Sequence, residues 1–213
     1  MDKKLRLALI LSIITIIYNV IEGVISVAFG MSDETLSLLG FGVDSFVEVI
    51  SGIGIFHLVM RMQYSEVKER DKFEKTALTI TGTAFYLLTI GLVAGSIINI
   101  IQGSKPETTV VGIIIAVISL ATMYFLMSAK LKVGKELNSD AIIADANCTK
   151  TCFYLSILLL ASSGLYEIFQ IGYIDSLGSL GIAYFAFTEG KEAFQKVKSG
   201  NLACGCDDNC HTN

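Results

Sequence analysis

Two pairs of metal-binding side chains repeat one spacing in separate apolar segments. Asp44 and Glu48 form the first pair, and Cys148 and Cys152 form the second. On a helix, side chains four residues apart share one face, with Cβ atoms about 5–6 Å apart. Two ionised carboxylates this close repel each other, so an apolar segment tolerates them when a cation, a proton or a water-filled cavity compensates. Oxygen and thiolate ligands in a tetrahedron suit zinc, and thiolates extend the preference to softer ions such as cadmium.

The hydrophobicity of the chain predicts that membrane helices position these pairs. Hydrophobic residues make up 53% of the 213 residues. Charged residues make up 17%, whereas a soluble domain carries about a quarter. We therefore expect an all-α integral membrane protein with six transmembrane helices. The first of them is predicted to be an uncleaved span, because its apolar run is too long for a signal peptide and lacks a small-residue cleavage site. The six predicted helices cover residues 5–29, 36–61, 74–101, 109–129, 139–165 and 173–190.

The positive residues predict the orientation of the helices. Of the 16 Lys and Arg residues, 14 lie on the side of the membrane that also holds both chain ends. Because cytoplasmic loops carry the excess of positive charge, both termini are predicted to be cytoplasmic, in the cell (inner) membrane. The 14 residues are Lys3, Lys4, Arg6, Arg61, Lys68, Arg70, Lys72, Lys75, Lys130, Lys132, Lys135, Lys191, Lys196 and Lys198.

This orientation places the two pairs at one depth. The predicted helix 36–61 enters from outside and the predicted helix 139–165 from the cytoplasm, and each pair lies roughly 9 and 13 residues into its helix. At about 1.5 Å per residue, both pairs reach a depth of about 12–20 Å, near the midplane of a ~30 Å core. We expect a four-ligand site there, with Asp145, one turn before Cys148 on the same face, as a candidate ligand or support.

Each of these residues also has a simpler interpretation. A buried cysteine often packs as a small hydrophobe, and paired carboxylates can belong to a structural ion pair. Glu22 lies one turn after Asn19 in the predicted helix 5–29, where it is a candidate proton relay or outer ligand, or simply a solvated acid. Asp175 and Glu189 lie near the ends of the last predicted helix, where capping or interfacial roles are expected.

The end of the chain is rich in thiols. Because a disulfide framework is unusual in such a chain, clustered thiols favour metal capture, with an unstructured reactive tail as the alternative. Without a basic patch interleaved with aromatics, the sequence does not support nucleic-acid binding. The tail cluster consists of Cys204, Cys206, Cys210 and His211.

These motifs resemble those of the cation diffusion facilitator family of metal transporters. Ser37-Leu-Leu leading to Asp44 and Glu48 is similar to the motif of the family's second helix. Ala144-Asp-Ala followed by Cys148 and Cys152 is similar to the fifth-helix motif, where the family usually has His-x-x-x-Asp. The segment from Asp175 to Glu189-Gly190 resembles the sixth helix, so the resemblance covers nearly the whole chain. The segment Gly40-Phe-Gly-Val-Asp-Ser resembles the corresponding segment of a compact bacterial branch of the family.

The resemblance implies proton-coupled export of a divalent metal from the cytoplasm, by alternating access and as a homodimer. Two departures modify this expectation. The chain ends about 23 residues after residue 190, so the family's cytoplasmic C-terminal domain is expected to be absent and a dimer to form largely through the membrane helices. The Cys-Cys pair shifts the expected metal preference from zinc toward softer ions. We expect a transporter domain over 1–190 and a cytoplasmic Cys-rich tail over 191–213.

The leading hypothesis is thus a metal/proton antiporter with Asp44, Glu48, Cys148 and Cys152 as ligands. A rival is a non-transporting membrane metal sensor or metal chaperone that works through its Cys-rich tail. A channel is a third option, although the sequence offers no filter-like loop. An enzyme is not expected, because no nucleophile–base pair or cofactor motif is apparent.

Overall fold

The computed structural model describes residues 3–33, 35–61, 67–137 and 140–199, and these residues form an all-helical bundle. The prediction of six helices is confirmed. In chain order they are α1 (Lys3–Ser32), α2 (Leu36–Arg61), α3 (Val67–Gln102), α4 (Val110–Leu137), α5 (Asp140–Phe169) and α6 (Tyr173–Ser199).

The helix ends differ from the prediction where charged residues follow an apolar segment. The helix α2 has the predicted bounds, but α4 continues to Leu137 rather than ending at 129, and α6 continues to Ser199 rather than ending at 190. The prediction followed hydrophobicity, whereas Lys and Glu are good helix formers and continue a helix beyond its apolar part. As a result Lys130, predicted in a connection, lies within α4.

Among the residues that the structure describes, five helices are long and apolar enough to cross a membrane, so the protein is a multi-pass membrane protein. These candidate spans lie in α1 to α5, and α6 is less apolar. The lower hydrophobicity of α6 arises in part from polar residues that face the inside of the bundle, because Asp175, Ser176 and Ser179 are buried. The candidate spans are Arg6–Ser32, Leu36–Gly54, Leu78–Gln102, Val110–Leu137 and Thr149–Phe169.

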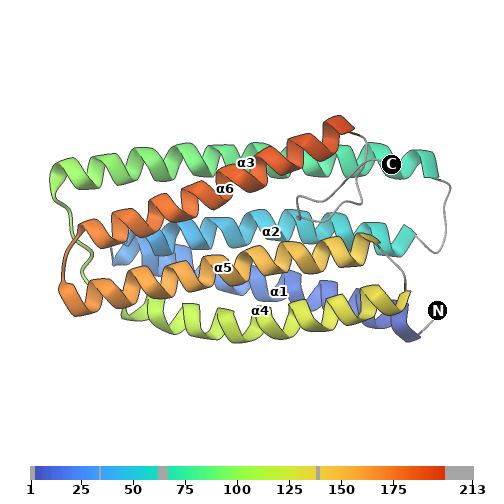
Figure 1. The fold of residues 1–213 in the computed structure, drawn as a ribbon, viewed down its shortest axis with the longest axis horizontal. Helices are drawn as coiled ribbons and strands as arrows, with labels where there is room; N and C mark the ends of the chain where they lie inside the picture. Colours follow the sequence, from blue (N-terminus) through green and yellow to red (C-terminus); the bar gives the residue numbers. More distant parts are fainter. Residues whose placement is uncertain (1–2, 34, 62–66, 138–139, 200–213) are drawn as a thin grey trace.

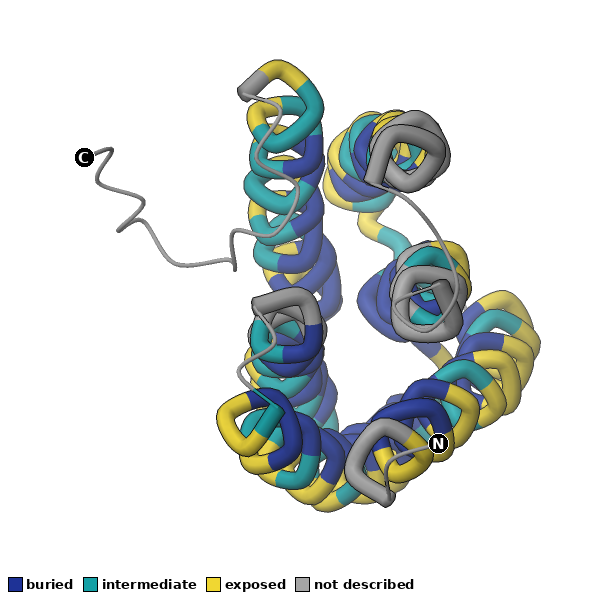
Figure 2. The backbone as a smooth tube through the Cα atoms, turned by 90° about the vertical axis from the view of Figure 1, so that its right-hand side faces the viewer, coloured by how far each residue is buried: buried dark blue, intermediate teal, exposed yellow. Residues whose placement is uncertain are grey.

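The helices pack mainly as three antiparallel pairs, and α2 also contacts helices of the other two pairs. Helix α1 packs against α2, α3 against α6 and α4 against α5, while α2 also contacts α3, α5 and α6 (Figure 1). The start of α1 and the end of α6 lie at the same end of the bundle (Figure 1). Exposed residues lie mainly on the outer faces of the helices (Figure 2), and many of them are large apolar side chains such as Ile17, Leu87 and Phe125, as expected of a surface in lipid.

Glycine allows α1 and α2 to approach closely. A Cβ atom on Gly42 of α2 would lie 2.7 Å from the Cβ atom of Ser26 and 2.8 Å from the backbone nitrogen of Val27, both on α1. Small residues permit such close helix contacts in membranes. This contact brings the polar side chains of α1 within reach of those of α2.

Two carboxylates at the end of the bundle opposite the termini cap helix starts. Asp175 of α6 accepts hydrogen bonds from the backbone nitrogens of Leu36, at 2.8 Å, and Ser37, at 3.2 Å, and from the Ser37 hydroxyl. Glu167 of α5 accepts one from the backbone nitrogen of Thr109, at 2.6 Å, just before α4. The first N–H groups of a helix have no partner within it, so these carboxylates satisfy them. Asp175 thus caps α2 rather than its own helix. We call Asp175 and Glu167 the cap carboxylates.

Candidate metal site

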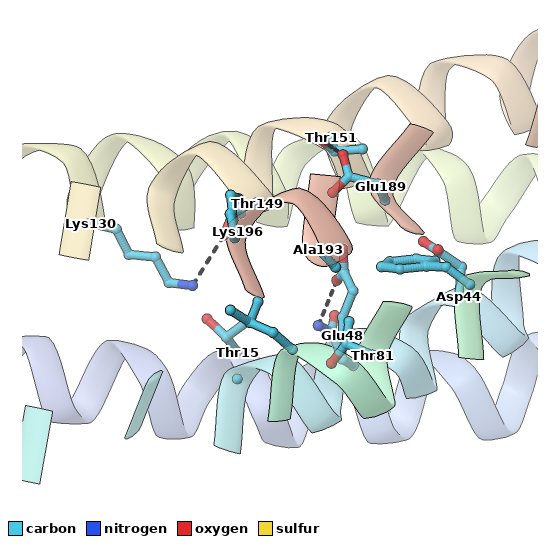
Figure 3. A pocket seen from close by; sticks show the side chains of 14 residues that line it. Thr15, Asp44, Glu48, Thr81, Lys130, Thr149, Thr151, Glu189, Ala193 and Lys196 are labelled. Carbon is cyan, nitrogen blue, oxygen red and sulfur yellow. Dashed lines mark hydrogen bonds between the residues drawn. The ribbon is translucent and has the colours of Figure 1, made fainter. Parts of the chain in front are cut away.

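A cavity lies inside the bundle, and side chains from all six helices line it. It encloses about 700 Å³ of space, its open mouth included. Figure 3 shows Lys130 and Thr149 toward one end of this cavity and Asp44 toward the other. The lining residues are Thr15, Asn19, Asp44, Glu48, Gly52, Leu78, Thr81, Phe85, Lys130, Thr149, Thr151, Glu189, Ala193 and Lys196.

Glu48 joins three helices at the cavity. Its Oε2 atom accepts a hydrogen bond of 2.8 Å from the Asn19 side-chain amide of α1, and its Oε1 atom accepts one from the Cys152 thiol of α5. Two of the predicted ligands, from segments far apart in the sequence, are therefore in direct contact. Asn19 is fully buried, and its side-chain oxygen has no hydrogen-bond partner in the described part of the chain. That oxygen is therefore available to coordinate a cation.

Asp44 lies one turn before Glu48 and is 3% exposed. Within the described ranges, no hydrogen bond or ion pair is found for its carboxylate, although it interacts electrostatically with Glu189 and Glu22. A buried carboxylate without a partner is costly unless a cation or a proton compensates it. Its surroundings therefore suit an exchangeable positive charge.

Glu22 forms a separate polar cluster between α1 and α2. Its Oε1 atom accepts a hydrogen bond of 2.8 Å from the Tyr18 hydroxyl, and its Oε2 atom accepts one of 3.1 Å from the Ser45 hydroxyl. Glu22 is buried, so the solvated-acid interpretation is wrong. Ser45 follows Asp44 directly, which places this cluster beside the cavity.

The other predicted ligands lie partly or wholly outside the described part of the structure. Asp145 and Cys148 belong to α5, but their side chains are not among those described. The tail cluster of Cys204, Cys206, Cys210 and His211 falls outside the described residues altogether. Among the side chains that are described, no three His, Cys, Asp or Glu residues already stand close enough together to hold one metal ion.

Two cavity residues were missed from the sequence. Glu189 of α6 was predicted to be interfacial or capping, but it lines the cavity and accepts a hydrogen bond of 3.0 Å from the Thr151 hydroxyl. Lys130 is buried and donates a hydrogen bond of 3.1 Å to the Thr149 hydroxyl. The missing signal was the length of α4 and α6, because helices extended to 137 and 199 place Lys130 and Glu189 well inside them.

Comparison with known proteins identifies the type of protein. The family model for the cation efflux transmembrane domain matches residues 8–197. The chain belongs to the cation efflux family. An uncharacterized transporter of Methanocaldococcus jannaschii is 25% identical over 175 residues, which are 80% of this chain and 62% of that protein. The chain thus spans about three fifths of the length of this relative. The match of the family model confirms the predicted family resemblance.

Proposed function

We propose that this protein exports a divalent, zinc-like metal cation across the cell membrane in exchange for protons. Membership of the cation efflux family supports the class of transport, and the contact of Glu48 with Cys152 carries the assignment of the site. A carboxylate and a thiol from two helices meet there beside the Asn19 amide. Mixed oxygen and sulfur ligands favour zinc and softer ions such as cadmium.

In this proposal Asp44, Glu48, Cys148 and Cys152 bind the ion, with Asp145 as a ligand or support. The ion replaces the hydrogen bonds that Glu48 now accepts, and side-chain rotation brings the ligands together. Thiols and carboxylic acids must lose their protons to bind a metal, so protons and the cation compete for the same atoms. This competition supplies the coupling in an antiporter.

Glu22 is proposed as a proton relay or outer ligand beside this site, together with Asn19. Its contacts with Tyr18 and Ser45 are hydrogen bonds from hydroxyl groups, which can pass a proton as well as stabilise a carboxylate. Glu22 therefore has a route for proton exchange that does not require it to contact the metal.

The proposed orientation has both termini in the cytoplasm, in the inner membrane, with a homodimer formed largely through the membrane helices. The start of α1 and the end of α6 share one end of the bundle, which agrees with this arrangement (Figure 1). The residues 191–213 were expected to form the tail, and 191–199 continue α6. The thiols and imidazole beyond them are proposed to capture metal before transport.

Zinc uptake into proteoliposomes, with and without an imposed pH gradient, tests the proposal. We expect the wild-type protein to accumulate zinc faster with the gradient, and Cys152→Ser to lose most of this uptake. Glu107→Gln is the matched control, because Glu107 is an exposed carboxylate in the connection before α4. Equal uptake by wild type and Cys152→Ser would refute the site, and uptake that ignores the gradient would refute the antiport.

A further inference from the structure

Helix α6 contributes a carboxylate to the cavity, although none of the predicted ligands belongs to α6. Glu189 lines the cavity together with Asp44 and Glu48. Its Oε1 atom accepts the hydrogen bond from Thr151, the residue immediately before Cys152 on α5. This contact ties the Glu189 carboxylate to α5 next to a proposed ligand. Within the described residues, this bond engages one carboxylate oxygen by one donor, so the group retains lone pairs for a cation.

Asp44 is the independent observation that points to a ligand between α2 and α6. It is almost fully buried, lines the same cavity, and has no hydrogen bond or ion pair within the part of the chain that is described. Its carboxylate interacts electrostatically with that of Glu189. Two carboxylates that face one buried space repel each other when ionised, and a divalent cation between them removes the repulsion.

Of the cavity lysines, Lys196 interacts electrostatically with Glu189, whereas Asp44 has no ammonium partner among the described residues. The Lys196 ammonium group is 3.9 Å from Glu192, and Lys130 donates a hydrogen bond to Thr149. Figure 3 shows Lys130 toward the end of the cavity away from Asp44. Lys196 offsets part of the charge of Glu189, and the remaining charge of the Asp44–Glu189 pair can be compensated by an ion that enters the cavity.

We infer that Glu189 is a ligand of the transported divalent cation and forms with Asp44 a carboxylate pair that joins α6 to α2. The inference rests on the proposed function and extends it, because the binding site then includes a third helix. It also adds an oxygen ligand to the set of carboxylates and thiols, which keeps zinc within the range of ions that the site accepts.

Replacing Glu189 by cysteine adds a thiolate at the proposed site and tests the inference directly, with Cd²⁺ as the probe. In full-length protein with Cys204, Cys206 and Cys210 replaced by serine, Cd²⁺ bound to thiolates produces a sulfur-to-cadmium absorption band. Glu189→Cys is expected to raise the band per bound ion by the contribution of one thiolate. Glu192→Cys, one turn further along α6, is the matched control and should leave the band unchanged. An unchanged band in Glu189→Cys would overturn the inference.

Affinity provides the second measurement. In the same background, Glu189→Gln is expected to weaken Cd²⁺ binding by about tenfold or more, while Glu189→Asp retains more of the affinity and Glu192→Gln all of it. Circular dichroism and elution volume check that the variants fold. If Cys152→Ser reduces the band but the Glu189 variants bind like their parent, Glu189 is no ligand and the proposed function stands. If the protein with only the three tail cysteines replaced binds no Cd²⁺, both the inference about Glu189 and the proposed function are refuted.

Discussion

The cap carboxylates and the cavity carboxylates are chemically the same group in two different surroundings. Asp175 is 1% exposed and Asp44 is 3% exposed, so burial does not distinguish them. Asp175 accepts two backbone N–H groups and a hydroxyl at the start of α2. Asp44 has no such donors among the described residues and faces a cavity together with Glu48 and Glu189.

The difference lies in whether the partner can be exchanged. The N–H groups at a helix start are fixed by the backbone and carry the positive end of the helix dipole, so they stabilise a carboxylate permanently. Of the cavity carboxylates Asp44, Glu48 and Glu189, Glu48 instead contacts an amide and a thiol, and Glu189 contacts a hydroxyl. These groups belong to Asn19, Cys152 and Thr151. Side chains of this kind can rotate away when a cation arrives. A cap carboxylate thus contributes to stability, and a cavity carboxylate is available for binding.

The largest expected effect comes from a matched pair of substitutions, one in each region. Asp44→Asn should reduce zinc transport to background without lowering the free energy of unfolding, because the amide removes a costly buried charge. Asp175→Asn should retain transport per folded molecule. Proteoliposome uptake and denaturant unfolding in detergent measure the two quantities. Transport by Asp44→Asn at the wild-type rate would show that the cavity carboxylates are no more important for transport than the cap carboxylates.

Zinc itself should stabilise the protein through the cavity alone. A ligand that binds only the folded state at 100 times its dissociation constant adds about 2.7 kcal/mol. We expect a zinc-dependent rise in the unfolding temperature of wild type and of Asp175→Ala, but not of Glu48→Gln. An equal rise in Glu48→Gln would place the bound zinc outside the cavity.

Loss of a cap should cost stability without affecting affinity. Asp175→Ala leaves the N–H groups of Leu36 and Ser37 without their acceptor, which is expected to lower the free energy of unfolding by about 1–2 kcal/mol. Zinc affinity, measured by calorimetry on the folded fraction, should stay at the wild-type value. A loss of affinity with unchanged stability would show that Asp175 acts on the site.

The smallest effect is expected from the tail, which belongs to neither region. Truncation after Gly200 removes Cys204, Cys206, Cys210 and His211. We expect zinc transport at saturating concentration to remain near the wild-type rate, because the proposed ligands all lie in the bundle. Complete loss of function would instead favour a sensor or chaperone that works through the tail.

The helices and the pairing of their ligands could be anticipated because both depend on local patterns. Apolar segments predicted the six helices, and the spacing of Asp44 and Glu48 predicted a shared face on one of them. The ends of α4 and α6 could not be anticipated in the same way, because apolar character stops at the first charges while the helix continues. Lys130 and Glu189 were misplaced for this reason.

The sequence by itself determined the membrane class, the six helices and the family, since hydrophobicity and residue spacing act within single segments. Only the tertiary structure decided which carboxylate meets which donor. Asp175 and Glu189 belong to the same helix, yet one meets the start of α2 and the other faces the cavity beside Thr151. The physical reason is that a carboxylate's partners come from neighbouring helices, whose relative placement depends on packing across the whole bundle.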